Sequence, residues 1–569
     1  MNTRIRKTTM LFIAILAINR AYAQQGSDPT SYAIPNVMTP EASDLGKYGT
    51  YSVNYYTGIP GIQIPLYEVK ETDMSVPISL SYTGSGCIPN KNAGIAGMDW
   101  NINAGGAITR VVNGVPDEKY NSSYESANTN LGFIYAQQHG YQHYSKEYIR
   151  TVQYISDITA PVYNLDYEYL PDVFSFNFLG HSGKFFMDNS GVIRVAGDRD
   201  YTVSLTNFTQ QYDFSISISA LTGSLYDLNT KMFSQILLKS DDGYQFYFGG
   251  AFNSVEISFS CPYYGVPDPK SGVINAWYLT KVISPDGNVI TFNYETYTDD
   301  DLYVIKNLFN SYSGAWLTKP ADFLELKYYR SQQVSSIYRH NNSYNLGPIT
   351  TNTFYLAYAS IIKRAYLKEI ESRTQTVSFL YSEKDLNTKF YYPDDYMKVS
   401  TATGSETDIR PSEWLRSRYS LKLDKITVAD KTVNDAEGGG KRAYNFEYTY
   451  YSHRLFLTGL TVNTDGPHYS FSYAGASELP SPLSCGVDQW GYYNGHDENG
   501  TTLIGIPAVA LSEYVCDLSG SVSGSPNRLP SADCLKGMLN TITYPTGGQT
   551  TFTYEQNRKI SRNICLIPF

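Results

Sequence analysis

The chain has little charge for its length, and this shortage excludes two classes of protein. Charged residues make up 17% of the 569 positions, against about 25% in an average soluble protein. A disordered chain would be charge-rich and aromatic-poor, whereas this one contains 53 tyrosines. A coiled coil would need abundant Ala, Glu, Lys and Leu. Tyr, Phe, Thr and Val suit the pleated surface of a sheet, so the composition predicts a folded, β-rich protein.

Long apolar runs are missing after the first two dozen residues, which predicts that the mature chain has no membrane span. The one apolar run, Met10–Ile18, follows three basic residues and is too short for a span of about 20 residues. Small residues at Ala21 and Ala23 then predict a secretory signal over residues 1–23, cleaved after Ala23. The alternative is an ordinary buried helix. The signal predicts export to the periplasm, the outer surface or the medium.

Positive charge is also scarce, with 44 basic residues against 54 acidic ones. Removing the signal removes four basic residues and takes the net charge from −10 to −14. A net negative field attracts neither nucleic acid nor an anionic membrane. The sequence therefore predicts no nucleic-acid partner.

Cysteine is sparse, and its spacing fits neither a metal site nor a disulfide-built scaffold. No two cysteines form a C-x-x-C pair, and an exported chain can form disulfides. Three cysteines fall within one stretch of about 50 residues, which favours a pair among them, but fifteen complete pairings are open. The six are Cys87, Cys261, Cys485, Cys516, Cys534 and Cys565.

The pattern of alternating and β-branched residues divides the mature chain into three parts. Residues 24–45 are polar and contain three prolines, which is typical of an extended leader. Residues 46–275 predict an N-terminal β-rich domain with an irregular insertion near 113–165. Residues 276–569 predict a second domain of β-hairpins.

Within the first domain, strands are expected over Ile62–Val69 and Val76–Tyr82, and as a strand–glycine turn–strand unit over 94–112. A hairpin is expected over 174–187. The best helix candidates are short and lie near 130–138 and 411–417.

An internal repeat is the most informative feature. The runs Leu279–Glu295 and Leu539–Glu555 share seven of seventeen positions without gaps. In each, an apolar strand leads into a Pro-x-Gly turn and a Thr-Phe-x-Tyr strand returns, which predicts a hairpin. Phe and Tyr two positions apart face the same side of a sheet. The alternative is that F-x-Y recurs by chance in a Tyr-rich chain. Looser copies are Leu237–Phe248, Leu367–Tyr381, Leu421–Tyr448 and Leu457–Tyr473.

These hairpins resemble YD-type repeats, and the surrounding chain resembles the N-terminal region of large exported RHS/YD-repeat proteins of the Bacteroidota type. The segments that carry the resemblance are PEASDLGKYG at 40–49, YYTGIPGIQIPLYEV at 55–69, VPISLSY at 76–82, GMDWNINAGGAITRVVNGVPDE at 97–118, PDVFSFNFLGHSGKFF at 171–186, WYLTKVISPDGNVITFNYE at 277–295, DQWGYYNG at 488–495 and GMLNTITYPTGGQTTFTYEQN at 537–557. The family region usually precedes a long repeat array, which this chain lacks. We therefore expect either a stand-alone N-terminal module or a truncated chain.

The resemblance and the hairpin repeat together imply an all-β fold of antiparallel, hairpin-rich sheets. Their arrangement is expected to be a multi-sheet sandwich or a propeller- or shell-like assembly. The function they imply is that of an exported, non-enzymatic β-scaffold or interaction module. Its expected partners are a downstream RHS/YD-repeat protein or a glycan or protein of the cell surface.

Motifs for chemistry are weak, so the sequence predicts no catalytic residue, metal or cofactor. His139 and His143 are four apart but lack the glutamate of a zinc-hydrolase motif. The acidic runs at 299–301 and 394–395 do not follow a calcium-loop pattern and fit solvated turns. Paired carboxylates of a hydrolase need only spatial nearness, so a carboxylate-based hydrolase stays an alternative.

One aromatic cluster admits a binding role. Its candidate residues are Trp490, Tyr492, Tyr493 and Asn494. Exposed rings beside Asn can stack on sugars, which gives a cell-surface glycan-binding module as the first alternative function. The other interpretation is structural, since aromatic cross-strand pairs stabilise sheets by about 0.2–1 kcal/mol each.

Overall fold

The computed structural model describes residues 51–113, 116–118, 132–134, 170–207, 233–264, 266–267, 273–295, 324–342, 345–384, 398–400, 406–408, 421–432, 441–497, 509–510, 521–522 and 528–556, apart from positions 52, 55–57, 90, 453, 482–483 and 485. These residues form antiparallel strands in large sheets, which confirms the all-β prediction. Residues from Val53 onward belong to one compact unit.

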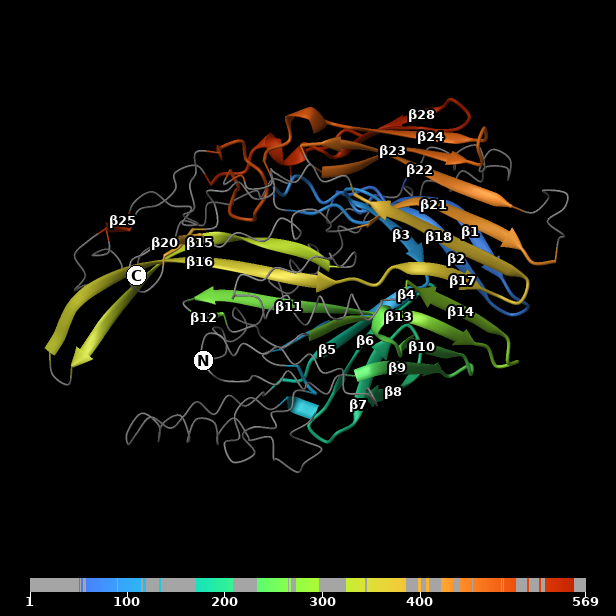
Figure 1. The fold of residues 1–569 in the computed structure, drawn as a ribbon, viewed down its shortest axis with the longest axis horizontal. Helices are drawn as coiled ribbons and strands as arrows, with labels where there is room; N and C mark the ends of the chain where they lie inside the picture. The colour runs from blue at the N-terminus through green and yellow to red at the C-terminus, as the bar shows by residue number, and fades with distance from the viewer. Residues whose placement is uncertain are drawn as a thin grey trace, which may run out of the picture. The chain divides into compact units, whose positions relative to one another are not determined.

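The largest sheet joins thirteen of the described strands, and its order follows the order of the chain (Figure 1). Every pairing in it is antiparallel, so each strand returns beside the one before it. Its strands are β8 (Tyr201–Asn207), β9 (Phe233–Ser240), β10 (Gln245–Gly249), β13 (Val273–Ile283), β14 (Val289–Tyr294), β17 (Leu367–Glu371), β18 (Gln375–Glu383), β21 (Leu421–Asp430), β22 (Arg442–Tyr451), β23 (Arg454–Val462), β24 (His468–Tyr473), β27 (Leu539–Thr543) and β28 (Gln549–Thr551).

All six repeat copies form hairpins in this sheet, which confirms the repeat. The paired strands are β9–β10, β13–β14, β17–β18, β21–β22, β23–β24 and β27–β28. Phe292 and Tyr294 are both buried on one face of β14, as the two-residue spacing predicts.

The Pro-x-Gly turn has the same geometry in the two best copies. The N–H of Gly287 donates to Ser284 O at 3.0 Å, and the N–H of Ser284 donates to Asn288 O at 3.0 Å. In the second copy, the N–H of Gly547 donates to Tyr544 O at 2.9 Å. The φ angles of Gly287 and Gly547 are +84° and +83°. This left-handed conformation ends a three-residue hairpin loop, and it favours glycine because a Cβ would be strained there.

In five of the six hairpins, the last aromatic residue meets a β-bulge. Between β14 and β17 the register shifts directly before Tyr294, which then pairs with Leu367, the first residue of the next hairpin. The extra residue of a bulge is left out of the ladder and the strand bends there. The same shift recurs at four other junctions and puts a leucine opposite the last aromatic of the preceding hairpin. These pairs are Phe248–Leu279, Tyr381–Leu423, Tyr448–Leu457 and Tyr473–Leu539.

The tyrosine hydroxyl also closes its own hairpin. The ladder between β13 and β14 ends at Lys281, two residues from Leu279. The hydroxyl of Tyr294 donates to the carbonyl of Leu279 at 2.8 Å, so this buried carbonyl has a partner although the ladder has ended. Three further hairpins repeat the contact, at Tyr381–Leu367 (2.8 Å), Tyr448–Leu423 (2.6 Å) and Tyr473–Leu457 (2.5 Å). We call these four hydrogen bonds the tyrosine–leucine row.

The last hairpin lacks the contact. The hydroxyl of Tyr554 is buried and has no hydrogen-bond partner. β28 ends at Thr551, three residues before this tyrosine, whereas β14, β18, β22 and β24 all reach or pass theirs.

A second sheet shares β13 with the first. Its other strands are β7 (Ile193–Gly197), β6 (His181–Met187), β5 (Val173–Phe178), β4 (Gly106–Val111), β11 (Val255–Tyr264), β12 (Val266–Pro267), β16 (Asn345–Lys363) and β15 (Leu324–Asn342). Residues 273–278 of β13 pair with β4 and β11, and residues 279–283 pair with β10 and β14. The domain boundary expected between residues 275 and 276 falls inside this strand. The hairpin expected over 174–187 is β5–β6, with Leu179 and Gly180 at positive φ in its turn.

A third sheet of β1 (Ile62–Lys70), β2 (Ser75–Tyr82) and β3 (Trp100–Ala104) packs against the largest one. Its first two strands confirm the predicted strands to within one residue at each end. Figure 1 shows β1 and β2 beside β18 and β21. The ring of Trp100 lies 4.9 Å from that of Phe471, and its indole N–H donates to the hydroxyl of Tyr473 at 2.8 Å.

The segment between β2 and β3 runs across the tyrosine–leucine row. The N–H of Leu423 donates to Ile95 O at 2.9 Å, and the N–H of Met98 donates to Leu455 O at 2.7 Å. Gly97 has a φ of +96°, and a Cβ there would lie 2.9 Å from the backbone nitrogen of Leu457. Glycine is therefore required for this close approach.

The described part of the chain also contains two short strand pairs, β19 (Lys398–Ser400) with β20 (Glu406–Asp408) and β25 (Val509–Ala510) with β26 (Ser521–Val522). Three-residue or four-residue 3-10 helices lie at Phe252–Ser254, Ala476–Glu478 and Ala532–Leu535. Of the helix expected near 130–138, only 132–134 are described, and Phe133 and Ile134 are helical and buried. The helix expected at 411–417, the leader and the signal lie outside the described residues.

The row can be tested by removing single hydroxyls. The substitution Tyr294→Phe leaves the carbonyl of Leu279 buried without a partner, so we expect it to lower the free energy of unfolding by about 1–3 kcal/mol. Urea denaturation followed by tryptophan fluorescence measures the change.

Tyr554→Phe is the matched control, because it removes a buried hydroxyl that has no partner. We expect this variant to be as stable as the parent or more stable. Equal losses in the two variants would show that the hydrogen bond of the row does not contribute to stability.

Candidate functional site

The predicted aromatic site forms a tight turn around Asp488. One carboxylate oxygen of Asp488 accepts the N–H groups of Trp490 at 2.9 Å and Tyr492 at 3.0 Å. Gly491 completes the turn with a φ of +90°. The Asp488 carboxylate thus fixes the backbone of the turn. The side chain of Trp490 takes no part in this contact and is 69% exposed.

The other predicted residues hold the turn in place. The ring of Tyr492 packs on Gly86, where a Cβ would lie 3.2 Å from it. Tyr493 is 7% exposed, and its N–H donates to Cys87 O at 2.8 Å. Asn494 is 1% exposed, and its amide donates to Leu529 O at 3.1 Å. The structure thus brings all four residues together, and among them Trp490 offers an open ring while Tyr493 and Asn494 are buried.

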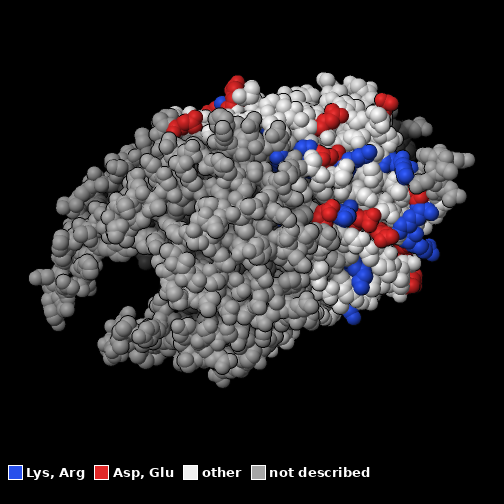
Figure 2. Space-filling model, in the orientation of Figure 1, with Lys and Arg blue, Asp and Glu red and all other residues white. Residues whose placement is uncertain are grey.

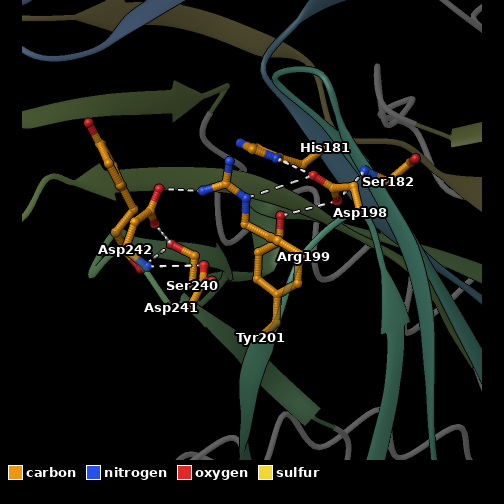
Figure 3. Close-up of polar contacts among 9 residues, drawn as sticks. His181, Ser182, Asp198, Arg199, Tyr201, Ser240, Asp241 and Asp242 are labelled. Atoms are coloured by element: carbon orange, nitrogen blue, oxygen red, sulfur yellow. Dashed lines mark hydrogen bonds and ion pairs between the residues drawn. The ribbon is translucent and has the colours of Figure 1, made fainter.

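A second polar cluster lies where β6 and β8 meet the hairpin β9–β10 (Figure 3). His181 Nδ1 lies 2.8 Å from a carboxylate oxygen of Asp198, and the hydroxyl of Tyr201 donates to the other oxygen at 3.3 Å. Burial acts to raise the pKa of Asp198, but the hydrogen bonds from His181 and the Ser182 N–H outweigh it and leave that pKa lowered. Sequence analysis assigned no role to His181, because its partner comes from the neighbouring strand end.

The same cluster contains a surface ion pair between Arg199 and Asp242, and Ser240 donates to that carboxylate as well. Burial raises the pKa of Tyr201, with help from the charge of Asp198, so this phenol stays neutral. A histidine–carboxylate pair can move a proton. Among the described contacts of His181, the hydrogen bond is to Asp198, and the ring of Tyr201 lies 6.2 Å away.

The third cluster is fully buried and was missed by sequence analysis. Arg110, on β4, donates from Nη1 to Glu118 at 2.6 Å and lies 3.5 Å from Asp172. Its Nε donates to Ile274 O at 2.9 Å, on the shared strand β13. The guanidinium also lies 5.1 Å from the ring centroid of Trp277, a cation–π distance.

Asp117 and Asp172 form two reciprocal hydrogen bonds, each from a backbone N–H to the other residue's carboxylate. The N–H of Asp117 donates to the Asp172 carboxylate at 3.1 Å, and the N–H of Asp172 donates to that of Asp117 at 2.9 Å. Glu118 and Asp172 therefore contact the guanidinium of Arg110, and Asp117 is bound to Asp172 beside them. Burial, together with the charge of Asp172, raises the pKa of Asp117 to about 8. Burial raises the pKa of Asp172 to about 6, against the opposing effect of Arg110.

This buried cluster is sealed rather than open. Asp117 and Asp172 are 0% exposed and Glu118 is 5% exposed. A glycoside hydrolase needs its carboxylates on either side of a bound sugar, so this cluster does not supply the accessible pair that the hydrolase alternative requires.

The described residues contain no group of three or more His, Cys, Asp or Glu side chains that could hold a metal ion. His139, His143 and the acidic runs at 299–301 and 394–395 lie outside those residues. Within the described ranges, no helix is long and apolar enough to span a membrane.

The raised pKa values predict how stability depends on pH. The folded chain keeps a proton on Asp117 that the unfolded chain releases near pH 4. Stability from this group is therefore present at low pH and is lost as pH rises toward about 8. The loss can reach several kcal/mol, since each pKa unit of difference corresponds to about 1.4 kcal/mol.

The substitution Asp117→Asn imitates the protonated form, so we expect its stability to change less than that of the parent between pH 5 and 9. Urea midpoints measured across this range compare the two proteins. Parallel curves would mean that Asp117 does not hold the proton.

No protein-family model matches the chain. No curated protein matches it either. Solved structures give weak similarities. A chain of the TcdB2-TccC3 crystal structure has a TM-score of 0.30 and 12% identity, covering 75% of this chain and 17% of that one. The N-terminal domain of the effector protein SpvB from Salmonella typhimurium strain LT2 has a TM-score of 0.28 and 13% identity, covering 71% of this chain and 99% of that domain. The Photorhabdus luminescens Tc holotoxin pore gives a TM-score of 0.26 at 12% identity, covering 73% of this chain and 16% of that one.

These TM-scores and identities are too low to support an argument about function. The chain is thus similar to parts of these toxin-related structures, and the resemblance to RHS/YD-repeat proteins stays a prediction from its motifs.

Proposed function

We propose that this protein is an exported, non-enzymatic β-scaffold of the RHS/YD-repeat type, and that it binds a further hairpin of its own kind on a partner protein. Export rests on the signal-like residues 1–23. The scaffold role is supported by the large sheet, in which each repeat adds two strands to the same surface. Figure 2 shows basic and acidic side chains interspersed over the described surface of one face, an arrangement that does not favour a polyanionic partner.

The observation that carries the proposal is the register between successive hairpins. At five junctions, the last aromatic of one hairpin pairs with a leucine near the start of the next. Each hairpin therefore presents a leucine-accepting position at its outer strand. This rule makes the sheet extendable by any strand that carries a leucine at the right place.

In the hairpin β27–β28, no described strand pairs with β28 on its outer side, so this leucine-accepting position is open among the described residues. Tyr554 has no leucine opposite it in the described registers. The tyrosine hydroxyl, which in four other hairpins binds a leucine of the same hairpin, has no partner here either. Exposed residues alternate with partly exposed ones from Gln549 to Tyr554, as in a strand. Strand addition to such an edge gives affinity through backbone hydrogen bonds and specificity through alternate side chains. We therefore place the partner's hairpin next to β28.

A peptide from the chain itself tests strand addition. Residues 367–381 form the hairpin that follows Tyr294, so they carry the leucine in the required register. We expect this peptide to bind the full protein and to slow hydrogen exchange at the amides of residues 549–554. Exchange measured by mass spectrometry with and without peptide reports the change.

The control peptide carries Leu367→Asp, which puts a charge opposite the partly exposed Tyr554. We expect it to protect these amides far less. Equal protection by both peptides, or none at saturating concentration, would contradict binding at this edge. A concentration-dependent dimer of the protein alone would assign the edge to a second copy instead.

A second candidate function is glycan binding, and the exposure of Trp490 favours it. Aromatic rings fixed by their backbone can stack on sugar faces without losing much conformational freedom, because the Asp488 turn is already ordered. In this alternative Trp490 is the binding residue, Tyr492 borders it, and Tyr493 and Asn494 position the turn.

Trp490→Ala separates this role from stability. Since the ring is 69% exposed, we expect the free energy of unfolding to change by no more than about 0.5 kcal/mol. In affinity electrophoresis through gels that contain xylan, mannan or peptidoglycan fragments, we expect the parent to be retarded and the variant to migrate freely.

Leu380→Ala, which removes another exposed apolar side chain, is the matched control and should stay retarded. If the parent is not retarded in any gel, or if Trp490→Ala is retarded equally, Trp490 does not bind these glycans.

A further inference from the structure

Two cysteines from distant parts of the sequence meet in the fold. The N–H of Cys87 donates to the carbonyl of Cys534 at 2.7 Å. Cys87 lies between β2 and β3, and Cys534 lies in the 3-10 helix Ala532–Leu535 before β27. Both are present as free thiols.

The backbone contact limits how far apart the two residues can be. With standard bond lengths, an N–O distance of 2.7 Å keeps the two Cα atoms within about 6.6 Å. Disulfides join residues whose Cα atoms are usually 4.4–6.8 Å apart. The Cα separation therefore does not exceed the range that a disulfide spans.

Neighbouring contacts hold both residues in place. The carbonyl of Cys87 accepts the N–H of Tyr493 at 2.8 Å. On the other side, the Ser531 hydroxyl oxygen accepts the N–H of Asp533 at 3.1 Å and caps the helix that carries Cys534. These hydrogen bonds thus hold the backbones of Cys87 and Cys534 beside each other before any covalent bond forms.

From this geometry we propose that Cys87 and Cys534 form a disulfide when the protein meets a disulfide oxidant, such as glutathione disulfide or a protein disulfide of the exported compartment. The bond would attach the segment before β3 to the last hairpin. The inference rests on the contact between the two residues and holds whether or not the scaffold proposal is correct.

The two thiols differ in exposure to solvent, and this difference decides which of them the oxidant meets first. Cys87 is 5% exposed, whereas Cys534 is partly exposed. Burial raises the pKa of the Cys87 thiol to about 11 and also raises that of Cys534. We therefore expect Cys534 to react first and slowly, because the thiolate is the attacking form.

The reaction is two successive exchanges. The thiolate of Cys534 attacks one sulfur of the oxidant, so that a mixed disulfide forms and one oxidant thiolate leaves. The thiolate of Cys87 then attacks Cys534 Sγ, which releases the second oxidant thiolate. Two protein thiols are oxidised, the oxidant is reduced to two thiols, and the two protons pass to the leaving thiolates.

Peptide mapping of the full-length protein tests the proposal. The protein is purified reduced, incubated with glutathione disulfide, alkylated with iodoacetamide and digested without reductant. We expect one peptide pair joined through Cys87 and Cys534, with loss of both residues from the alkylated fraction. Reduction with dithiothreitol should return both to that fraction.

Cys534→Ser and Cys87→Ser should each abolish the linked peptide pair. The parent alone decides the outcome if either variant fails to fold. Full alkylation of Cys87 after oxidation would overturn the proposal, as would a bond from Cys534 to Cys485 or Cys516, the partners that sequence proximity favours. An increase in the urea midpoint on oxidation, absent from Cys534→Ser, would show that the bond stabilises the folded chain.

Discussion

The largest sheet depends on a hydrogen bond that four of its six hairpins share, from a tyrosine hydroxyl to the carbonyl of a leucine near the start of the same hairpin. The ladder of β13 and β14 ends two residues from Leu279. At Tyr294, the strand of the next hairpin pairs with β14 after a β-bulge. Without the hydroxyl, the leucine carbonyl in each of these four hairpins would lose this hydrogen bond. In these four hairpins the tyrosine thus allows the strands to bend while the backbone carbonyl keeps a hydrogen-bond partner.

A shared strand connects this sheet to the second one. β13 changes partners at Leu279, the residue that also begins the tyrosine–leucine row. Next to the change of sheet, Arg110 binds the backbone of β13 and two buried carboxylates. A buried ion group of this kind adds little net stability by itself. Its geometry instead fixes how β4, β5 and β13 meet.

Sequence reasoning found the parts of the fold that depend on neighbours in the chain. Alternation and Pro-x-Gly turns identified six hairpins, because strand partners within a hairpin are set by a few local residues. It did not find the bulges, since Phe-x-Tyr gives no sign of the register that follows it. The domain boundary expected between residues 275 and 276 lies within β13, which pairs in both sheets.

The sequence by itself determined an all-β chain of repeated hairpins, because period-two patterns and turn residues act over short distances. Tertiary structure decided everything that joins residues far apart. It brought Arg110 to Asp172, placed Cys87 against Cys534, and separated the exposed Trp490 from the buried Asn494. Such contacts depend on the order in which strands pair and on how sheets stack. No local pattern encodes that order, so only the folded chain reveals it.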